Sequence, residues 1–383
     1  MKIVIAPDSF KGSLSSLAVT KAVKQGFEEV FPNAEILSIP LADGGEGTVK
    51  SVIENCGGNI LTTAVTDPLG ERILADYGVT SDGKSAIIEM AAASGLMLIP
   101  EIKRNPMNTT TFGTGDLIKS ALDKGFRNII IGLGGSATTD GGAGAVQALG
   151  TKLLDKNGAD IKLGGRYLSD LDRIDISGID KRISECHFTL ACDVNNPLYG
   201  KSGAAYVFAE QKGASKEGIQ ILDNHLKHFS EKIKLFLDKD VSEIPGAGAA
   251  GGLGAGLCAF MDAEVKSGTN FLLEMINFRE KIKDADLVIT GEGSLDSQTK
   301  FGKVLSGVSE VCKEIEVPVI AICGTIKRGA DEKGFDRVYS LVKGEISEEF
   351  AVKNAEELLI EKSKQIAMDY LSLSHKLSAK ICV

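Results

Sequence analysis

Residues 61–90 read LTTAVTDPLGERILADYGVTSDGKSAIIEM, and this stretch decides the fold of the middle of the chain. Runs rich in β-branched and apolar residues are separated by the tetrapeptide DPLG (67–70) and by the pair DG (82–83). Proline at the second position of a turn and an Asp-Gly pair are typical of the tight turns that join hairpin strands. The stretch therefore predicts an antiparallel β meander.

The end of the same stretch, GVTSDGKS (78–85), matches the phosphate-binding pattern G-x-x-x-x-G-K-[ST]. That pattern binds nucleotide only where a strand precedes it and a helix begins at its Lys-Ser pair. Here Lys84 and Ser85 follow a tight turn and enter the strand-like run AIIEM (86–90). We therefore interpret the match as an exposed hairpin tip with a solvated lysine.

Strands and helices alternate on both sides of the meander. The apolar run KIVIA (2–6) is typical of a buried parallel strand, and Val19, Val23 and Phe27 follow it at helical spacing. Three more strand-like runs begin near residue 284. This alternation predicts an α/β protein with a Rossmann-like, mostly parallel three-layer domain, plus a second α/β domain that contains the antiparallel β meander.

The domain boundaries follow from the same comparison. The α/β units at the two ends of the chain are more similar to each other than to the antiparallel middle, and no Ser/Pro-rich linker separates them. We therefore expect a discontinuous Rossmann-like domain from residues 1–60 and 284–383, with an inserted α/β domain from residues 61–283.

Composition limits the class of protein. The chain has 383 residues, of which 43% are hydrophobic and 25% charged, as in ordinary folded domains. Its net charge of −9 and the lack of a dense Lys/Arg run argue against a nucleic-acid partner. Seven scattered cysteines without a C-x-x-C pair favour reduced thiols. No apolar run approaches the ~18 residues of a membrane span, so we expect a cytoplasmic protein without a membrane partner.

Polar, glycine-rich segments are the candidates for chemistry. They are APDSFKGS (6–13), LADGGEGT (41–48), GLGGSATTDGGAG (132–144), ACDVNNP (191–197) with PGAGAAGGLGAG (245–256), and TGEGSLDSQT (290–299). Most of them follow predicted strands, and in open α/β sheets ligands bind beyond the carboxyl ends of the strands. Glycine lets the backbone approach phosphate oxygens, and helix N-termini supply free N–H donors. We therefore expect these segments to form the ligand site.

Carboxylates occur in or beside each of these segments. They are Asp8, Asp43, Glu46, Asp140, Asp193, Glu292 and Asp296. Any one of them could be a helix N-cap or a turn residue. Together they suit a magnesium ion, which takes one or two carboxylates and substrate phosphates as ligands. Lys11 and Lys303 are the nearest basic residues, and each could steady a phosphate or be solvated.

Other chemistries fit the sequence less well. The segment GAGAAG (246–251) has the spacing of a dinucleotide-binding loop, but Pro245 before it argues against the central strand that this loop requires. The segment GEGSLD (291–296) follows a strand but has Asp296 in place of the third glycine. The four histidines lie far from the glycine-rich segments, and no G-x-S-x-G elbow is present. A nicotinamide oxidoreductase, a zinc site and a serine hydrolase are therefore disfavoured.

The glycine-rich segments, taken together, resemble a known family. APDSFKGSLS, PLADGGEGT, GLGGSATTDGGAG, ACDVNNPL, PGAGAAGGLGAG and TGEGSLDSQT are similar, in this order and spacing, to the bacterial glycerate kinases of the two-domain α/β type. The similarity covers essentially the whole chain. One departure is Thr139, where the family usually has Asn. The resemblance implies ATP-dependent, Mg2+-assisted phosphorylation of D-glycerate, at the 2-hydroxyl.

Phosphoryl transfer depends mostly on positioning and charge neutralisation, and this suggests a role for each residue. We expect Asp193 to orient or deprotonate the attacking hydroxyl, and Asp43 and Glu46 to hold Mg2+ or substrate hydroxyls. Lys11, with Ser9, would meet the glycerate carboxylate or the transferred phosphoryl group. The predicted catalytic residues are Asp193, Lys11 and Asp43; the substrate-binding residues are Ser9, Asp8 and Glu46; the metal ligands are Asp193 and Asp43. The predicted nucleotide-binding residues are Gly134, Gly135, Ser136, Asp140, Gly291, Glu292, Gly293 and Asp296.

Two alternative functions stay open at the level of sequence. A kinase that forms 3-phosphoglycerate would use the same segments, as would a non-enzymatic sensor that binds a small hydroxy acid. ADP release in the presence of glycerate would separate kinase from sensor. The sequence also leaves open whether the chain forms a homodimer.

Overall fold

The computed structural model describes residues 1–45, 47–295, 304–342, 344 and 346–381, with only the backbone for 373–381. The chain forms two compact units, Met1–Asp43 with Thr269–Val383, and Gly44–Gly268. These boundaries differ from the predicted ones near residues 60 and 284. Helix α2 (Thr48–Cys56) packs on strands of the second unit, whereas the helices of residues 269–283 contact the first unit. No helix of the described residues has the length and apolar character that crossing a membrane requires.

The first unit is built on a five-stranded parallel sheet with the order β13-β12-β11-β1-β2. The strands are β1 (Lys2–Ile5), β2 (Glu35–Ser38), β11 (Leu287–Leu295), β12 (Val319–Ile326) and β13 (Arg337–Ser340). The chain runs from β1 to the edge strand β2 and then resumes on the other side of β1, at β11. Strand order therefore reverses between β1 and β11, the position at which open α/β sheets bind ligands.

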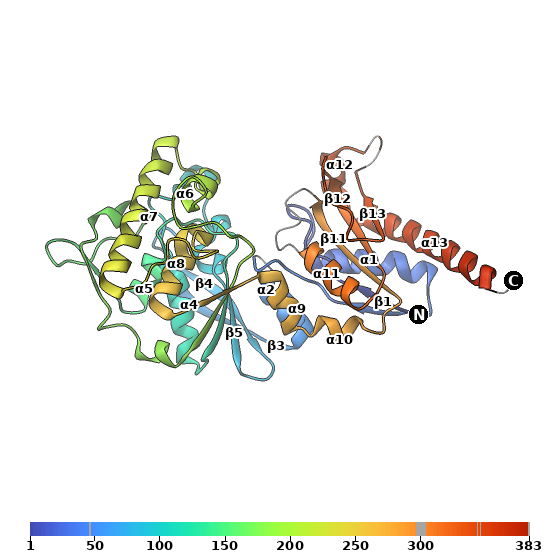
Figure 1. Ribbon diagram of the computed structural model, residues 1–383, viewed down its shortest axis with the longest axis horizontal. Coiled ribbons are helices and arrows are strands. Elements are labelled where there is room, and N and C mark those ends of the chain that lie inside the picture. Colours follow the sequence, from blue (N-terminus) through green and yellow to red (C-terminus); the bar gives the residue numbers. More distant parts are fainter. Residues whose placement is uncertain (46, 296–303, 343, 345, 382–383) are drawn as a thin grey trace. The chain divides into compact units, whose positions relative to one another are not determined.

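Helices cover both faces of this sheet (Figure 1). Ile3, Ile5 and Ile289 project from one face into a core with α1 (Ser16–Val30) and α13 (Ala355–Ile381). Leu305 of α11 (Val304–Glu314) packs on the opposite face. The remaining helices of the unit are α9 (Gly268–Met275), α10 (Phe278–Ile282) and α12 (Glu348–Lys353). The three-layer parallel architecture is the one that the sequence predicts.

The second unit contains a six-stranded mixed sheet with the order β10-β9-β6-β5-β4-β3. Its strands are β3 (Gly58–Thr66), β4 (Arg72–Thr80), β5 (Ser85–Glu89), β6 (Asn128–Gly132), β9 (His187–Ala191) and β10 (Glu264–Lys266). Strands β3, β4 and β5 are antiparallel, which confirms the predicted meander. Ser85 opens a strand rather than a helix, so the P-loop interpretation is excluded. Strands β5, β6, β9 and β10 are parallel, so their carboxyl ends share one edge.

Helices pack on this mixed sheet, and all of them except α2 contribute to one large core. They are α2, α3 (Ala91–Ser94), α4 (Phe112–Asp123), α5 (Ala143–Ala148), α6 (Ala204–Phe208), α7 (Lys216–Leu237) and α8 (Ala249–Met261). Helix α5 ends at Ala148. Gly150 adopts a φ of 97°, and residues 152–154 form β7 (Lys152–Leu154), which pairs with β8 (Arg173–Asp175).

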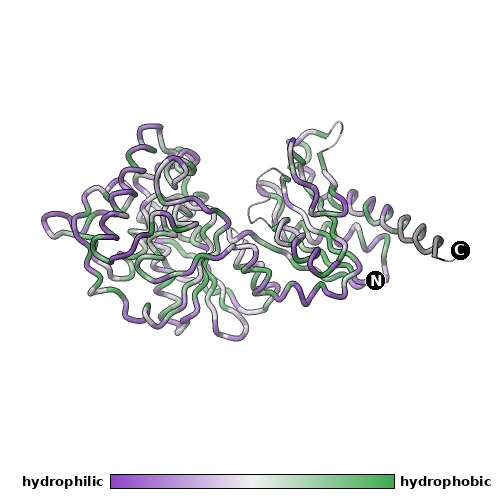
Figure 2. Tube along the Cα trace, viewed as in Figure 1, coloured by the Kyte–Doolittle hydropathy of each residue, from purple (hydrophilic) through white to green (hydrophobic). Residues whose placement is uncertain are grey.

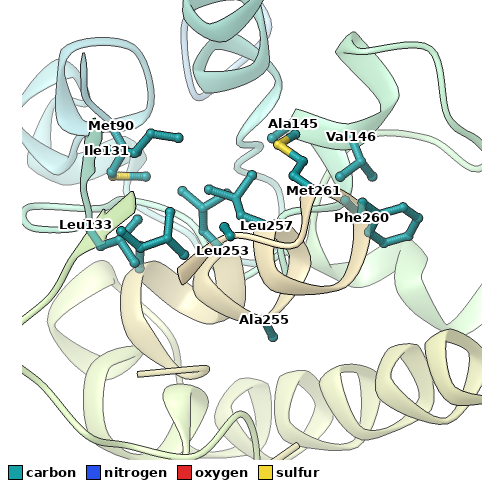
Figure 3. Close-up of a cluster of buried hydrophobic side chains, with 14 of the residues drawn as sticks. Met90, Ile131, Leu133, Ala145, Val146, Leu253, Ala255, Leu257, Phe260 and Met261 are labelled. Atoms are coloured by element: carbon teal, nitrogen blue, oxygen red, sulfur yellow. The ribbon is translucent and has the colours of Figure 1, made fainter. Parts of the chain in front are cut away.

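Helix α8 follows a glycine-rich segment. Residues 245–256 are expected to form a ligand loop; in the structure α8 (Ala249–Met261) is kinked at its start, where Ala250, Gly251 and Gly252 adopt left-handed φ values, and residues 246–256 are buried. Figure 3 shows Leu253 of α8 beside Leu133, and Phe260 of the same helix beside Val146. This segment and the central strands are hydrophobic, as the colours of Figure 2 indicate, and this accounts for the burial of α8. The glycines here serve close packing, which the sequence alone did not distinguish from ligand binding.

Candidate functional site

In the first unit, the predicted site residues gather at the point where strand order reverses. Asp8 and Lys11 follow β1, and Asp43 follows β2. The backbone N–H of Asp8 donates to the carbonyl oxygen of Gly291 in β11 at 2.8 Å. The N–H of Leu41 donates to the carbonyl oxygen of Pro7 at 2.9 Å. These bonds fix the segments after β1 and β2 against the sheet.

Lys11 is surrounded by carboxylates. Its Nζ lies 2.5 Å from Oδ2 of Asp43. Burial lowers the pKa of Lys11, but Asp43, Asp8 and Glu292 together outweigh it and hold the pKa above its ordinary value. Asp8 is 4% exposed, and its Oδ1 accepts a hydrogen bond from the N–H of Ser9 at 2.6 Å. Burial, followed by the charge of Asp43, raises the pKa of Asp8 to about 6.

The segment 291–293 is a strand rather than the predicted loop. Gly291, Glu292 and Gly293 lie within β11 and pair with β12. A side chain at Gly291 would collide with the carbonyl oxygen of Ile322, so glycine is required there for strand packing. Glu292 is 6% exposed and contributes to the field at Lys11. The predicted residues Glu46 and Asp296, and the nearby Lys303, lie outside the described residues.

In the second unit, three neighbouring parallel strands bring their ends together. The glycine-rich segment 133–142 follows β6, Asp193 follows β9, and Ser267 follows β10. The hydroxyl of Ser267 donates to Oδ1 of Asp193 at 3.0 Å. The predicted nucleotide loop and the predicted catalytic carboxylate thus end adjacent strands of one sheet.

Residues 134–138 are the candidate for binding phosphate, and we call them the glycine loop. Hydrogen bonds to its carbonyl groups and from one of its N–H groups hold this loop to the rest of the unit. The N–H of Leu96 donates to the carbonyl oxygen of Gly135 at 2.9 Å. The N–H of Ala137 donates to the carbonyl oxygen of Ser94, also at 2.9 Å. In the described part of the chain, the N–H groups of Gly134, Gly135 and Ser136 donate to no protein acceptor. Adjacent unpaired N–H groups of this kind suit the oxygens of an anion.

Close backbone packing explains two glycines of this region. A side chain at Gly134 would place its Cβ 2.5 Å from Cα of Gly45, and one at Gly132 would meet the carbonyl oxygen of Gly44. Distances this short do not occur for real Cβ atoms. The segments 44–45 and 132–134 can therefore lie against each other only because both are bare backbone.

Asp140 is built into the structure of its own segment. The side chain is fully buried, and Oδ2 accepts hydrogen bonds from the N–H of Thr111 at 2.8 Å and from its hydroxyl at 2.9 Å. The N–H groups of Gly142 and Gly144 also donate to its oxygens. Burial raises the pKa of Asp140 against the opposing effect of these bonds. These contacts organise the loop around its carboxylate; the predicted contact of Asp140 with nucleotide stays a prediction.

Three polar residues of this region were not predicted from the sequence. Ser267 contacts Asp193, as described above. Glu89 ends β5, and its Oε1 accepts a hydrogen bond at 2.7 Å from the N–H of Val49 in the first turn of α2. Lys212 is buried and donates to the glycine loop. Glu89 could have been found, because it is the polar residue that ends an apolar strand. Lys212 follows no strand and carries no local signal.

The carboxylates of the site offer hard oxygen ligands. Among the described residues, no group of three or more His, Cys, Asp or Glu side chains is arranged to hold a metal ion by itself. Mg2+ commonly uses one or two protein carboxylates and completes its shell with phosphate oxygens and water. Asp43 in the first unit and Asp193 in the second each offer carboxylate oxygens of the kind that such a substrate-dependent ion takes.

Comparisons with known proteins show which family the chain resembles. The sequence pattern of the glycerate kinase family matches residues 3–371. The glycerate 2-kinase of Escherichia coli (strain K12) is 51% identical over 370 residues, covering 96% of this chain and 97% of that protein. The glycerate kinase of Bacillus subtilis (strain 168) is 48% identical over 370 residues, covering 96% and 97%.

A solved structure gives the same result. The crystal structure of the Salmonella typhimurium LT2 protein described as glycerate kinase 2 matches with a TM-score of 0.86 and 50% sequence identity. The match covers 98% of this chain and 99% of that one. The chain belongs to the glycerate kinase family.

Proposed function

We propose that this protein is an ATP-dependent kinase that transfers the γ-phosphoryl group to the 2-hydroxyl of D-glycerate, giving 2-phosphoglycerate. The observation that carries the proposal is the full-length similarity to the glycerate 2-kinase of Escherichia coli, at 51% identity. The clustering of polar residues at the carboxyl ends of both parallel sheets supports it, because this is where such sheets bind ligands.

The glycine loop is the proposed site for the nucleotide phosphates. Its three N–H groups that have no acceptor among the described residues can donate to phosphate oxygens, and Asp140 and the packing of α8 hold the loop from behind. Bare glycine backbone brings these donors close to the ligand without a side chain in the way. The hydroxyl of Ser136 lies in the same loop.

Asp193 is the proposed group for the attacking hydroxyl of glycerate. It ends β9 beside the glycine loop, and Ser267 fixes the position of one of its oxygens. A carboxylate in this place can orient the hydroxyl and accept its proton as the phosphoryl group leaves ATP. Asp193→Asn keeps the size of the side chain and removes the base, so we expect a large loss of kcat with little change in folding.

Lys11 and the carboxylates around it are the proposed site for the substrate acid. An ammonium group can pair with the glycerate carboxylate or with the transferred phosphoryl oxygens, and Ser9 can add a hydrogen bond. Asp43 is already within 2.5 Å of Lys11, so it holds the lysine side chain in place. The raised pKa of Lys11 keeps it cationic at neutral pH.

Mg2+ would be held by Asp43 and Asp193 as the protein's oxygen ligands. Bound there, the ion would neutralise charge on the phosphate oxygens, which is its usual contribution to phosphoryl transfer. Chelation with EDTA should abolish turnover, and addition of Mg2+ should restore it.

Phosphorus NMR of the product tests the proposal. The purified protein, D-glycerate, ATP and Mg2+ should give ADP together with the resonance of 2-phosphoglycerate. The resonance of 3-phosphoglycerate would instead support the other regiochemistry. Glycerate binding without ADP release would identify the non-enzymatic sensor.

A further inference from the structure

A buried lysine lies directly behind the glycine loop. Lys212 ends a short 3-10 turn, Glu210–Lys212, and is only 2% exposed. Its Nζ donates to the hydroxyl oxygen of Ser136 at 2.7 Å and to the carbonyl oxygen of Thr138 at 2.6 Å. Both acceptors belong to the glycine loop, so the ammonium group holds this loop at two points, one on each side of Ala137.

The charge of Lys212 has no ionic partner in direct contact. Within the described residues, no carboxylate lies within 4.0 Å of its Nζ. Burial lowers the pKa of Lys212 to about 7, and the field of Asp140 only partly offsets this effect. Glu210 on the same turn is exposed to solvent. A buried ammonium group without a counter-ion is costly to folding, and such groups are often found where a ligand of opposite charge binds.

The ammonium and the free backbone donors belong to the same short stretch of structure. Lys212 binds the loop through one hydroxyl and one carbonyl oxygen, and these contacts leave the N–H groups of Gly134, Gly135 and Ser136 available. Removing the ammonium would release both of these contacts. The loop would then lose these two contacts and a buried positive charge together.

We propose that Lys212 is a positioning residue for the nucleotide: it holds the glycine loop through Ser136 and Thr138 and supplies the buried positive charge that favours phosphate there. This inference rests on the proposed function, since it assigns the loop to nucleotide phosphates. It adds a residue that neither the glycine-rich pattern nor any strand end reveals.

A linkage to protons follows from this arrangement. An anion near the loop favours the charged form of Lys212, so nucleotide binding should raise its pKa. Above neutral pH a fraction of the free protein holds this lysine neutral, because its pKa is about 7. Binding should therefore take up protons from the buffer at a pH of about 8.

Isothermal titration calorimetry tests the proposal. ADP with Mg2+ is titrated into the full-length protein at a pH of about 8, in buffers that differ in their enthalpy of ionisation. The wild type should take up a fraction of a proton for each ADP bound. Lys212→Met should bind ADP about tenfold more weakly, as expected on losing a charge-assisted contact, and without proton uptake. Lys216→Met is the matched control, because Lys216 is exposed on the next helix, and it should behave as the wild type.

Further outcomes separate the two proposals. ADP binding by the wild type without proton uptake, and with equal affinity in Lys212→Met, would overturn the role of Lys212 and leave the proposed kinase intact. Failure of the wild type to bind ADP would overturn both. If Lys212→Met does not fold, Lys212→Arg decides: arginine keeps its charge at this pH, so ADP binding without proton uptake is expected, and uptake that persists contradicts the proposal.

Discussion

At the scale of single residues, the ammonium group of Lys11 lies among carboxylate side chains of the first unit. Asp43 contacts it, and Asp8 and Glu292 add to the field that raises its pKa. The sequence indicated these residues only as members of separate segments. The structure shows that the segments after β1 and β2 and the end of β11 bring them together, because these strands are neighbours in the sheet.

Replacing Lys11 should impair catalysis more than stability. Lys11→Met removes the ammonium group and keeps an unbranched side chain, so we expect kcat/KM for glycerate to fall about 100-fold, the usual cost of losing one electrostatic contact in a transition state. Steady-state kinetics at saturating ATP measure this. Lys24→Met is the control, because Lys24 lies on α1 and pairs only with Glu28 in the described structure. Equal rates in the two variants would remove Lys11 from the mechanism.

Asp8 should make stability depend on pH. Its pKa is about 6 in the folded protein against 3.8 ordinarily, because it is buried beside Asp43. Between these two pH values the folded chain binds more protons than the unfolded chain, so the free energy of unfolding falls as pH rises through this window. The contribution is roughly 3 kcal/mol.

Urea unfolding of the wild type and of Asp8→Asn, from about pH 4 to pH 7, measures this effect. The variant should lose most of the decrease that the wild type shows in the window, because asparagine does not titrate. Parallel curves for the two proteins would show that Asp8 does not carry the effect.

At the scale of secondary-structure elements, the glycines of α8 show what a sequence pattern leaves undecided. A glycine-rich segment can approach a ligand or another backbone, and both uses have the same local signature. The sequence assigned residues 245–256 to a ligand loop. In the structure, side chains at Gly251 and Gly256 would collide with the carbonyl oxygens of Thr138 and Gly141. These glycines therefore let α8 pack directly on the backbone of residues 138–141.

Two glycines in helices should respond oppositely to the same substitution. Gly256→Ala should destabilise the protein by about 1–3 kcal/mol, because its methyl group overlaps the backbone of Gly141. It should also weaken nucleotide binding by displacing the segment that continues from the glycine loop. Gly218→Ala in α7 meets only ordinary contacts, the nearest at 3.4 Å, and should stabilise by about 0.5–1 kcal/mol. Denaturant titrations compare the two, and a harmless Gly256→Ala would contradict the packing argument.

Local patterns predicted the strands better than they predicted the contacts of polar residues. The apolar runs of β1, β6 and β11 and the turns of the meander are local, so the parallel and antiparallel strands could be recognised. The partners of Asp140 could not, because Thr111 is separated from it by 29 residues and reaches it only through tertiary packing. The extension of β11 to Leu295 was missed for the same reason, since pairing with β12 makes its glycines a strand.

At the scale of the whole molecule, each unit carries its own core and its own set of polar strand ends. The first unit presents Asp8, Lys11 and Asp43, and the second presents the glycine loop and Asp193. The boundary between them falls at Asp43 and Gly44, inside the segment LADGGEGT that the sequence treats as one loop. The alternation of strands and helices at both ends of the chain led to a predicted boundary near residue 60. In the structure α2 packs on β3, β4 and β5 and so belongs to the second unit.

This division predicts which unit each ligand protects. In the described chain, the N–H groups of Gly134, Gly135 and Ser136 have no protein acceptor, and neither do those of Lys11 and Gly12. Such amides exchange rapidly with solvent until a ligand accepts their hydrogen bonds.

In hydrogen–deuterium exchange with mass spectrometry, ADP with Mg2+ should slow exchange in peptides that cover the glycine loop. D-Glycerate should slow exchange in peptides that cover the segment after β1. Peptides from the exposed face of α7 serve as the internal control and should be unaffected. Protection by ADP of the segment after β1 alone would reverse the assignment, because the phosphates would then bind at Lys11 and the glycine loop would need another role.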